Sequence, residues 1–422
     1  MKAKQLLTAT AFCMMTATTL TSCEGALDDI FGEWDKPTPA DTSQKFDPLV
    51  IPLTFEAVSG NTTLTIQTPL IDGKTIEYSV DNGTTWTSAT AKGDGNPLGY
   101  IDVISITANK ILLRGKNDNY YDVYIKINED SYVYGNIMSL IFGEDFIGKY
   151  TLDKEKNKSA FSHLFSYNPH LLSHDSKDLV LPATSLAPSC YNGLFIECTN
   201  LTRAPELPAT DLTGCDRCYM DMFEGCRSLI ATPALPATKL SKFCYAGIFH
   251  YCDKLKEGSV LPVTDLTGCD DCYSYMFFNC KELIKAPELP ATKLAKECYY
   301  SMFCGCPELE IAPDLPATQL EEGCYDTMFA ICPKLTKAPT LPAETLVKDC
   351  YNLMFKNCAK LGSVTCLATS GFELTRVLSE WITNAGTDES VTTRTLYVKS
   401  GHSGESWNAP TGTYAWNIVD NQ

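Results

Sequence analysis

The chain has 422 residues, of which 20% are charged and 44% hydrophobic, and its formal net charge is −17. This length predicts two to four structural units, and the hydrophobic share is sufficient for buried cores. The acidic balance argues against a nucleic-acid partner and against electrostatic docking on anionic lipid, and leaves cationic, neutral and glycan-like partners open.

Residues 1–22 have the pattern of a secretion signal. Two lysines form a basic start, and the uncharged stretch from Leu6 to Leu20 is too short and too polar to span a bilayer. It ends in Leu-Thr-Ser-Cys at Cys23, which resembles the lipobox of bacterial lipoproteins. That resemblance implies cleavage before Cys23 and stable anchoring through more than one acyl chain. The alternative is an ordinary secretory signal with a chance cysteine at its end.

Acidic residues follow this cysteine closely, at Glu24, Asp28, Asp29 and Glu33. They resemble the surface-export signal of Bacteroidetes lipoproteins, which implies a lipid-anchored place on the outer membrane, facing the cell exterior. Residues 23–47 contain the stretch DKPTPADTS and few apolar residues. This composition predicts a flexible tether that holds the remaining chain away from the membrane.

Residues 48–146 predict an all-β domain. Apolar and polar residues alternate in seven short segments, at 53–58, 63–68, 75–80, 84–89, 102–107, 111–115 and 121–127. This period of two indicates half-buried strands, and Asp81-Asn82-Gly83 predicts a hairpin turn. We expect a small immunoglobulin-like β-sandwich. The aromatic residues Trp86, Tyr120 and Tyr121 are either a sugar-stacking platform or ordinary core and strand-edge residues.

A repeat occupies residues 181–369. The string LPAT or a close variant begins seven copies, and the steps between them are 26 or 28 residues; the first residues of the copies are Leu181, Leu207, Leu235, Leu261, Leu289, Leu315 and Leu341. Each copy reads approximately LPAT-x-L-x(3)-C-Y-x-x-M-F-x-x-C-x-x-L-x-x-A-P-x. A degenerate copy in residues 147–180 predicts an N-terminal cap, and residues 370–422 predict a C-terminal cap with a helix near 372–382 and strands at 394–399 and 414–419.

Each copy predicts one helical piece and one strand. At 100° per residue, the apolar positions from Cys190 to Leu201 fall within one arc of about 140°, which suits a buried helix face. The segment LTRAPELP at 201–208 is short and predicts a strand. Stacking the copies then gives an α/β solenoid with short parallel strands and short helical turns.

The patterns L-x-x-A-P-x-LPAT and C-Y-x-x-M-F-x-x-C-x-x-L resemble the BspA-like leucine-rich repeats of bacterial surface proteins, over about residues 160–369. The resemblance implies a curved solenoid with its sheet on the concave side, and an adhesin that binds host matrix proteins or other bacteria. The usual A-F-x-x-C core is M-F-x-x-C here. Prolines in the strand, as at Pro205 and Pro287, also depart from the pattern and put the regularity of the sheet in doubt.

Eighteen of the 20 cysteines lie between Cys190 and Cys366. Two of them recur in each copy on the predicted buried arc, so we expect small buried thiols rather than bridges. The pairs Cys215/Cys218 and Cys269/Cys272 have zinc-like C-x-x-C spacing, but they lie two copies apart, and a local disulfide or an unpaired thiol fits better than one metal. Cys304, on the outward arc, and Cys366, past the last full copy, are the two candidates for an exposed thiol.

The sequence contains no catalytic motif, and its cysteines follow the repeat, so that no single one is marked as a nucleophile. We therefore expect a binding protein without cofactor, metal site or enzymatic activity. The leading hypothesis is an adhesion or recognition protein for a host protein, other cells or glycan. Its candidate ligand-binding residues are Arg203, Glu206, Lys285, Glu288 and Asp314, beside the predicted strands. The alternative is a structural spacer or nutrient-capture lipoprotein in which the β domain binds glycan.

Overall fold

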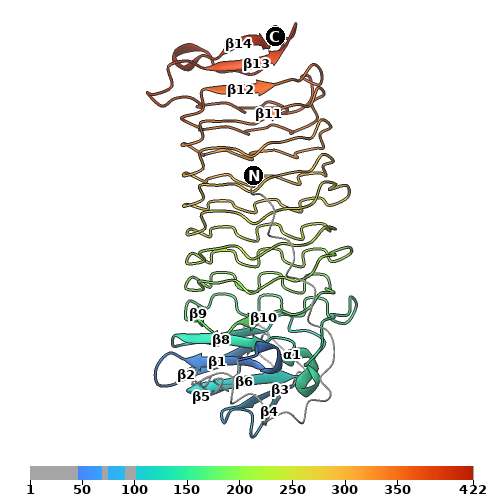
Figure 1. Cartoon of the computed structure of the whole chain (residues 1–422), viewed down its shortest axis with the longest axis vertical. Coiled ribbons are helices and arrows are strands. Elements are labelled where there is room, and N and C mark those ends of the chain that lie inside the picture. Colours follow the sequence, from blue (N-terminus) through green and yellow to red (C-terminus); the bar gives the residue numbers. More distant parts are fainter. Residues whose placement is uncertain (1–45, 69–74, 91–100, 422) are drawn as a thin grey trace, which may run out of the picture. The chain divides into compact units, whose positions relative to one another are not determined.

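The computed structural model describes residues 46–68, 75–90 and 101–421 (Figure 1). The chain from residue 46 onward forms one compact unit. The predicted signal peptide, the predicted acylation site Cys23 and nearly all of the predicted tether lie outside the described residues. The described chain is mostly sheet and turns, and the one α-helix in it, α1 (Ser139–Phe142), has four residues.

Eight strands form the β domain, close to the segments that the alternating pattern predicts. They are β1 (Leu53–Ala57), β2 (Thr62–Thr68), β3 (Thr75–Ser79), β4 (Thr87–Thr90), β5 (Ile101–Ala108), β6 (Lys110–Gly115), β7 (Tyr124–Ile127) and β8 (Ser131–Asn136). Neighbours in the order β8-β1-β6-β3-β4 form one antiparallel set, and β5-β2-β7 form a second sheet. Leu53 and Phe55 of the first set and Leu64 and Ile66 of the second enter one core.

The predicted turn between β3 and β4 forms at Asn82 and Gly83. Their φ angles are +58° and +85°, a left-handed conformation that Asn and Gly tolerate best. The carboxylate of Asp81 accepts hydrogen bonds from the backbone N–H of Thr85 at 2.9 Å and from its hydroxyl at 2.7 Å. These contacts lengthen the connection, so β4 begins at Thr87 rather than at residue 84.

Backbone pairing joins the β domain to the first, degenerate copy of the repeat. Strand β8 pairs in parallel with β9 (Leu171–Ser173) and β10 (Leu179–Val180). The N–H of Ile125 donates to the carbonyl of Leu164 at 2.7 Å. The rings of Phe55 and Phe165 meet edge to face at 6.0 Å. The β domain therefore covers the apolar end of the stacked copies.

The predicted helical pieces are wrong. Residues 189–198 and their equivalents form a chain of turns, and Figure 1 shows these copies as undulating lines without helix ribbons. Alternate N–H groups donate to the next copy, as Tyr191 does to the carbonyl of Cys218 at 2.9 Å and Phe195 does to Met222 at 2.9 Å. The N–H groups between them donate three residues back, as Leu194 does to Tyr191. The fold class is therefore sheet and turn, not α/β.

Every fourth residue of this segment is left-handed, which prevents a helix from winding. In the first full copy Ser189, Gly193 and Glu197 have φ angles of 54–58°, and the same three places are left-handed in each later copy. One residue with positive φ after three residues without it interrupts the winding that an α-helix requires, so the chain continues along an extended path. We name the outward side of these segments the turn face.

Two aromatic ladders fill the interior of the stack. Tyrosines stack from Tyr191 to Tyr351 with ring centroids 5.6–6.1 Å apart, and phenylalanines stack from Phe165 to Phe355 at 5.4–5.9 Å. Most of these pairs are nearly parallel, as Phe277 and Phe303 are at 2°. Because no copy can bury its own rings, the core is shared between neighbours.

The second cysteine of each copy has a hydrogen-bonding role. Its thiol donates to the carbonyl of the phenylalanine one copy earlier, as Cys252 does to Phe223 at 3.1 Å and Cys306 does to Phe277 at 3.1 Å. Seven such contacts run from Cys198 to Cys358, at 3.0–3.2 Å. A thiol suits this place because it is a small apolar group with one weak donor. All 18 cysteines from Cys190 to Cys366 are unpaired and buried, so neither of the two candidates for an exposed thiol, Cys304 and Cys366, is exposed.

The predicted strands of the copies form only in part. Between most copies pairing is reduced to single bridges, such as Glu257 with Lys285 and Ile311 with Lys337. Proline supplies no N–H to a ladder, so Pro205 and Pro287 interrupt the pairing. Regular parallel strands form at the C-terminal end, as β11 (Thr340–Leu341), β12 (Ser363–Cys366), β13 (Thr395–Lys399) and β14 (Asn417–Asn421).

The predicted helix near 372–382 is also wrong. Its place is taken by one more chain of turns, with left-handed Arg376, Glu380 and Asn384. The N–H of Tyr351 donates to the carbonyl of Val377, and the indole of Trp381 is fully buried and donates to the carbonyl of Trp407 at 2.8 Å. The tail therefore continues the stack and closes it with large side chains, as an end cap requires.

Candidate functional site

The segments equivalent to residues 202–206 present a second surface, the strand face. Leu201, Pro205 and Leu207 are buried there, whereas residues 202, 203 and 206 are exposed. The equivalent three places are exposed in the next five copies as well, and they carry the variable side chains. Four of these side chains are exposed and branched apolar residues, namely Ile230, Val260, Ile284 and Ile311. Exposed apolar groups gathered on one surface are typical of a binding site.

A hollow of about 630 Å³ lies on the strand face between two neighbouring copies. It contains three of the five predicted binding residues, Lys285, Glu288 and Asp314. The remaining lining residues are Ile284, Ala286, Pro287, Leu289, Pro290, Glu310, Ile311, Ala312, Pro313 and Pro316. The structure thus brings these three residues together around a mostly apolar, proline-rich depression.

The chemistry of this hollow is apolar with an acidic border. Ile284 and Ile311 are 53% and 58% exposed. The Lys285 ammonium lies 3.6 Å from the carboxylate of Glu257, which is an exposed pair of small energetic value. The three carboxylates Glu288, Glu310 and Asp314 outnumber this one lysine, so the border favours a partner with apolar and basic groups.

The other two predicted residues, Arg203 and Glu206, lie elsewhere. They line a hollow of about 690 Å³ where the first full copy meets β8 and β10. The guanidinium of Arg203 donates to the carbonyl of His174 and to the carboxylate of Asp178, the latter at 3.1 Å. Because these groups already occupy it, Arg203 holds the junction together. The predicted set therefore forms two sites separated by intervening copies, not one.

The thiols are not nucleophiles poised to react. Burial raises the pKa of the Cys244 thiol to about 12, and burial likewise raises the pKa of Cys366 to about 12. A thiol with such a pKa is protonated at neutral pH and is therefore a weak nucleophile. Within the described ranges, no group of three or more His, Cys, Asp or Glu side chains is placed to hold a metal ion.

The aromatic residues of the β domain do not form a shared platform. Tyr120 is fully buried, and its hydroxyl donates to the carbonyl of Leu140 at 2.8 Å. The Trp86 ring is covered by the guanidinium of Arg114, 4.1 Å from the ring centre. Tyr121 is exposed. The core alternative is thus the better description of Tyr120, and stacking of a sugar on Trp86 requires the arginine to move.

Sequence reasoning missed an aromatic cluster on the turn face. It comprises His250, Tyr251, Tyr275, Phe278 and Tyr300, from three consecutive copies. The signal was present, because these outward places hold small or polar residues in most other copies. Averaging the copies into one consensus conceals such departures.

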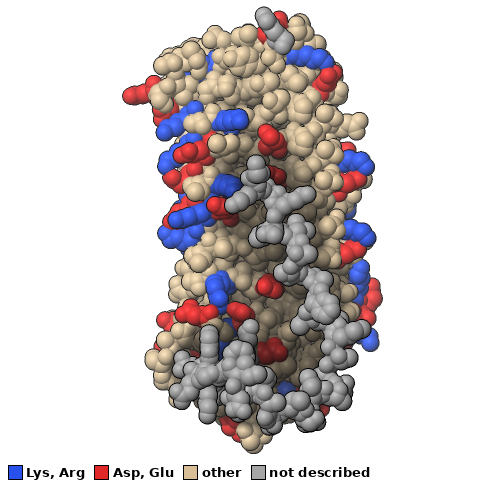
Figure 2. All heavy atoms as spheres, in the orientation of Figure 1, with Lys and Arg blue, Asp and Glu red and all other residues tan. Residues whose placement is uncertain are grey.

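Charged side chains mostly pair between copies. On the face that Figure 2 shows, Lys and Arg lie close to Asp and Glu along both margins, with a largely uncharged surface between them. Lys239 pairs with Asp211 at 3.0 Å and Lys293 with Asp265 at 2.7 Å, each one copy apart. Such pairs set the register of the stack more than its stability.

No protein-family model matches the chain, and no curated protein or solved structure matches it either. In the part of the chain that the structure describes, no helix is long and apolar enough to cross a membrane.

Proposed function

We propose that the chain is a surface-exposed lipoprotein of the BspA-like type, anchored in the outer membrane through Cys23, whose stacked copies recognise a protein on a host or neighbouring cell. In this proposal the copies form a leucine-rich-repeat solenoid and the β domain is an immunoglobulin-like sandwich. The lipobox-like end of the signal and the repeat patterns support it. So do the parallel pairing of copies and the single core that the two antiparallel sheets share.

The observation that carries the proposal is the hollow around Lys285, Glu288 and Asp314. Ile284 and Ile311 expose apolar surface there, next to acidic groups. Two exposed isoleucines beside a depression form an apolar surface that a peptide segment with apolar and basic side chains would cover. Full burial of an exposed isoleucine contributes about 1.5–3 kcal/mol, and because Ile284 and Ile311 are only about half exposed, covering each one contributes about half of that.

The experiment compares adhesion of cells that display the full chain to immobilised host-matrix proteins and to partner bacteria. The double variant Ile284→Ser/Ile311→Ser is expected to lower adhesion at least tenfold. The matched control is Ile230→Ser, at an isoleucine that is 62% exposed on the same face but outside the hollow. Equal adhesion by the double variant and the control overturns the role of the hollow.

The anchor is tested separately by metabolic labelling with a radioactive fatty acid. The chain is expected to carry the label, and Cys23→Ser is expected to lose both the label and surface display. Cys13→Ser, within the uncharged stretch of the signal, is the matched control and is expected to retain both. Labelling that survives Cys23→Ser contradicts the proposed anchor.

A further inference from the structure

The aromatic cluster on the turn face lies on a different chain segment from the strand face, and nothing in the proposed recognition hollow uses it. We name it the aromatic platform: His250, Tyr251, Tyr275, Phe278 and Tyr300. Large apolar rings at a surface lose the stabilisation that burial gives, so a group of five in consecutive copies requires an explanation.

The rings of the platform are in mutual contact. The His250 ring stacks on Tyr251 at 4.3 Å and 14°, and it meets Phe278 edge to face at 4.8 Å. Tyr275 contacts Phe278 at 5.6 Å and Tyr300 at 5.0 Å, in both cases near perpendicular. Because the rings brace one another, the platform is rigid before any ligand arrives, and binding loses little conformational entropy.

The platform is partly open and bears polar groups. Tyr275 is 36% exposed, and Tyr251, Phe278 and Tyr300 are half-buried. Burial, and to a lesser extent the neighbouring hydroxyl of Tyr300, raises the pKa of Tyr275. A ring face beside hydroxyl groups suits a ligand that has both apolar C–H surface and hydroxyls.

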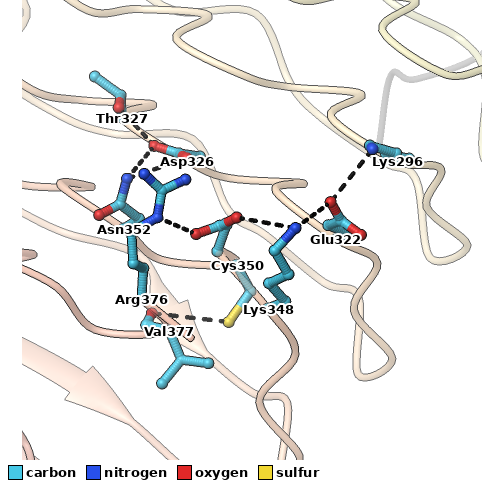
Figure 3. Close-up of polar contacts among 10 residues, drawn as sticks. Lys296, Glu322, Asp326, Thr327, Lys348, Cys350, Asn352, Arg376 and Val377 are labelled. Atoms are coloured by element: carbon cyan, nitrogen blue, oxygen red, sulfur yellow. Dashed lines mark hydrogen bonds and ion pairs between the residues drawn. The ribbon is translucent and has the colours of Figure 1, made fainter. Parts of the chain in front are cut away.

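One border of the platform is a hydrogen-bonded polar cluster in the next two copies (Figure 3). The carboxylate of Asp326 accepts hydrogen bonds from the amide of Asn352 at 3.0 and 3.1 Å and from the hydroxyl of Thr327 at 2.6 Å. The backbone N–H of Ser301, next to Tyr300, donates to the carbonyl of Asp326 at 2.9 Å. The cluster thus fixes the backbone that carries Tyr300.

Cations next to the platform are already paired with carboxylates, which leaves little charge for an anionic ligand. Arg227, whose guanidinium lies 5.8 Å from the centre of the Tyr251 ring, pairs with Glu197 at 3.5 Å and with Asp253 at 3.3 Å. The nearby cation Arg376 is bound to Asp349 at 2.7 Å. At the opposite border, burial and the nearby Glu224 raise the pKa of Asp221 to about 7, and burial raises the pKa of Asp271 to about 6. Carboxyls with a pKa raised in this way carry less than a full negative charge near neutral pH, so this border attracts a cation only weakly.

The geometry points to a neutral carbohydrate as the occupant of the aromatic platform. Pyranose rings stack their C–H faces on tyrosine and phenylalanine, and their hydroxyls bond to the tyrosine hydroxyls at the edge. Platform rings of successive copies lie about one hexose ring apart, because the ring centre of Tyr275 is 6.1 Å from that of His250 and 5.0 Å from that of Tyr300. The platform therefore accommodates a short oligosaccharide that runs along the stack.

The test applies the full chain to an array of neutral, anionic and cationic glycans, and then to affinity electrophoresis in the neutral polysaccharides that bind. Tyr275→Ala/Tyr300→Ala is expected to weaken binding at least tenfold. Tyr275→Phe, which keeps the ring, is expected to weaken it by less than about threefold. The matched control Tyr397→Ala removes a tyrosine of similar exposure, 38%, from β13 and is expected to leave binding unchanged.

Three outcomes overturn the inference: binding to no neutral glycan, binding only to charged glycans, or neutral-glycan binding that the double variant retains. Melting temperatures of all variants establish that the stack remains folded. The outcome is independent of the adhesion assay, because the isoleucine variants of the strand face do not touch the platform.

Discussion

The phenylalanine ladder makes a quantitative prediction at Phe277. Its ring is fully buried between Phe249 at 5.6 Å and Phe303 at 5.7 Å. Phe277→Ala removes a buried ring and leaves a cavity, which costs about 3–5 kcal/mol. Phe277→Leu keeps most of the volume and loses the two ring contacts, each of about 0.5–1.5 kcal/mol, so it is expected to cost about 1–3 kcal/mol.

Urea denaturation gives the free energy of unfolding, and hydrogen exchange followed by mass spectrometry shows where the loss falls. Because each copy contacts only its neighbours, faster exchange is expected in segments 243–252, 271–280 and 297–306, with little change in 189–198. The control Phe278→Ala removes the next residue, a half-buried ring, and is expected to cost less than half as much. A Phe277→Ala cost below about 1 kcal/mol, or a uniform loss of protection along the stack, refutes the reasoning.

Three further predictions concern backbone strain, pH and thiol reactivity. Gly247→Ala is expected to lower the free energy of unfolding more than Gly268→Ala. Both glycines are left-handed, but a Cβ at Gly247 would lie 2.0 Å from the Asp221 carboxylate, whereas a Cβ at Gly268 would have no neighbour within 4 Å. Equal losses of stability in thermal denaturation contradict this. Burial raises the pKa of Asp221 from 3.8 to about 7. Between about pH 4 and 7 the carboxyl is therefore protonated in the folded state and ionised in the unfolded state. The contribution of this group to stability falls as the pH rises through that window. Asp221→Asn is expected to remove that fall. If the melting temperatures of the variant and of the unchanged chain depend on pH in the same way, Asp221 is not the group responsible. The thiols of residues 190–366 are expected to resist Ellman's reagent until denaturant is added. Thr238→Cys, at an exposed place, is the control and is expected to add one thiol that reacts at once. Rapid reaction of several native thiols contradicts the burial of the cysteines.

The position of the buried residues could be predicted from the sequence, but their backbone could not. Cys190, Tyr191, Leu194, Phe195 and Cys198 follow both a helical period of 3.6 and a period of four. Over nine residues the two differ by less than half a residue per turn, so the arc calculation cannot separate them. The left-handed places distinguish them, yet in this chain Phe243, Tyr275 and Ile331 occupy some of those places and hide the glycine signal.

For the strands, the sequence indicates the backbone conformation itself. Proline in the A-P-x-L-P segments already indicates an interrupted sheet, and the structure has single bridges there. At residues 363–366 the sequence SVTC contains no proline, and β12 forms with full parallel pairing to β13. The alternating segments of the β domain were equally informative, because burial on one face imposes a period of two.

The candidate site was only partly accessible to sequence reasoning. Lys285, Glu288 and Asp314 share a hollow because they occupy outward places in adjacent copies. The repeat length predicts that these places lie close together. Arg203 occupies an equivalent place but lies at the junction with the β domain, where Asp178 and His174 engage it. A contact between separate units has no signature in the repeat, and neither does the platform, which depends on departures from the consensus.

The backbone hydrogen bonds between copies run from each copy to the next, and this direction has a mechanical consequence. A pulling force applied between the two ends of the stack acts along those bonds and meets one copy boundary at a time. The copies would therefore separate singly, beginning at an end, instead of failing together. Each released copy of 26 residues adds about 90 Å of extended chain. The stack would lengthen under load in discrete steps while the copies that remain keep their shape.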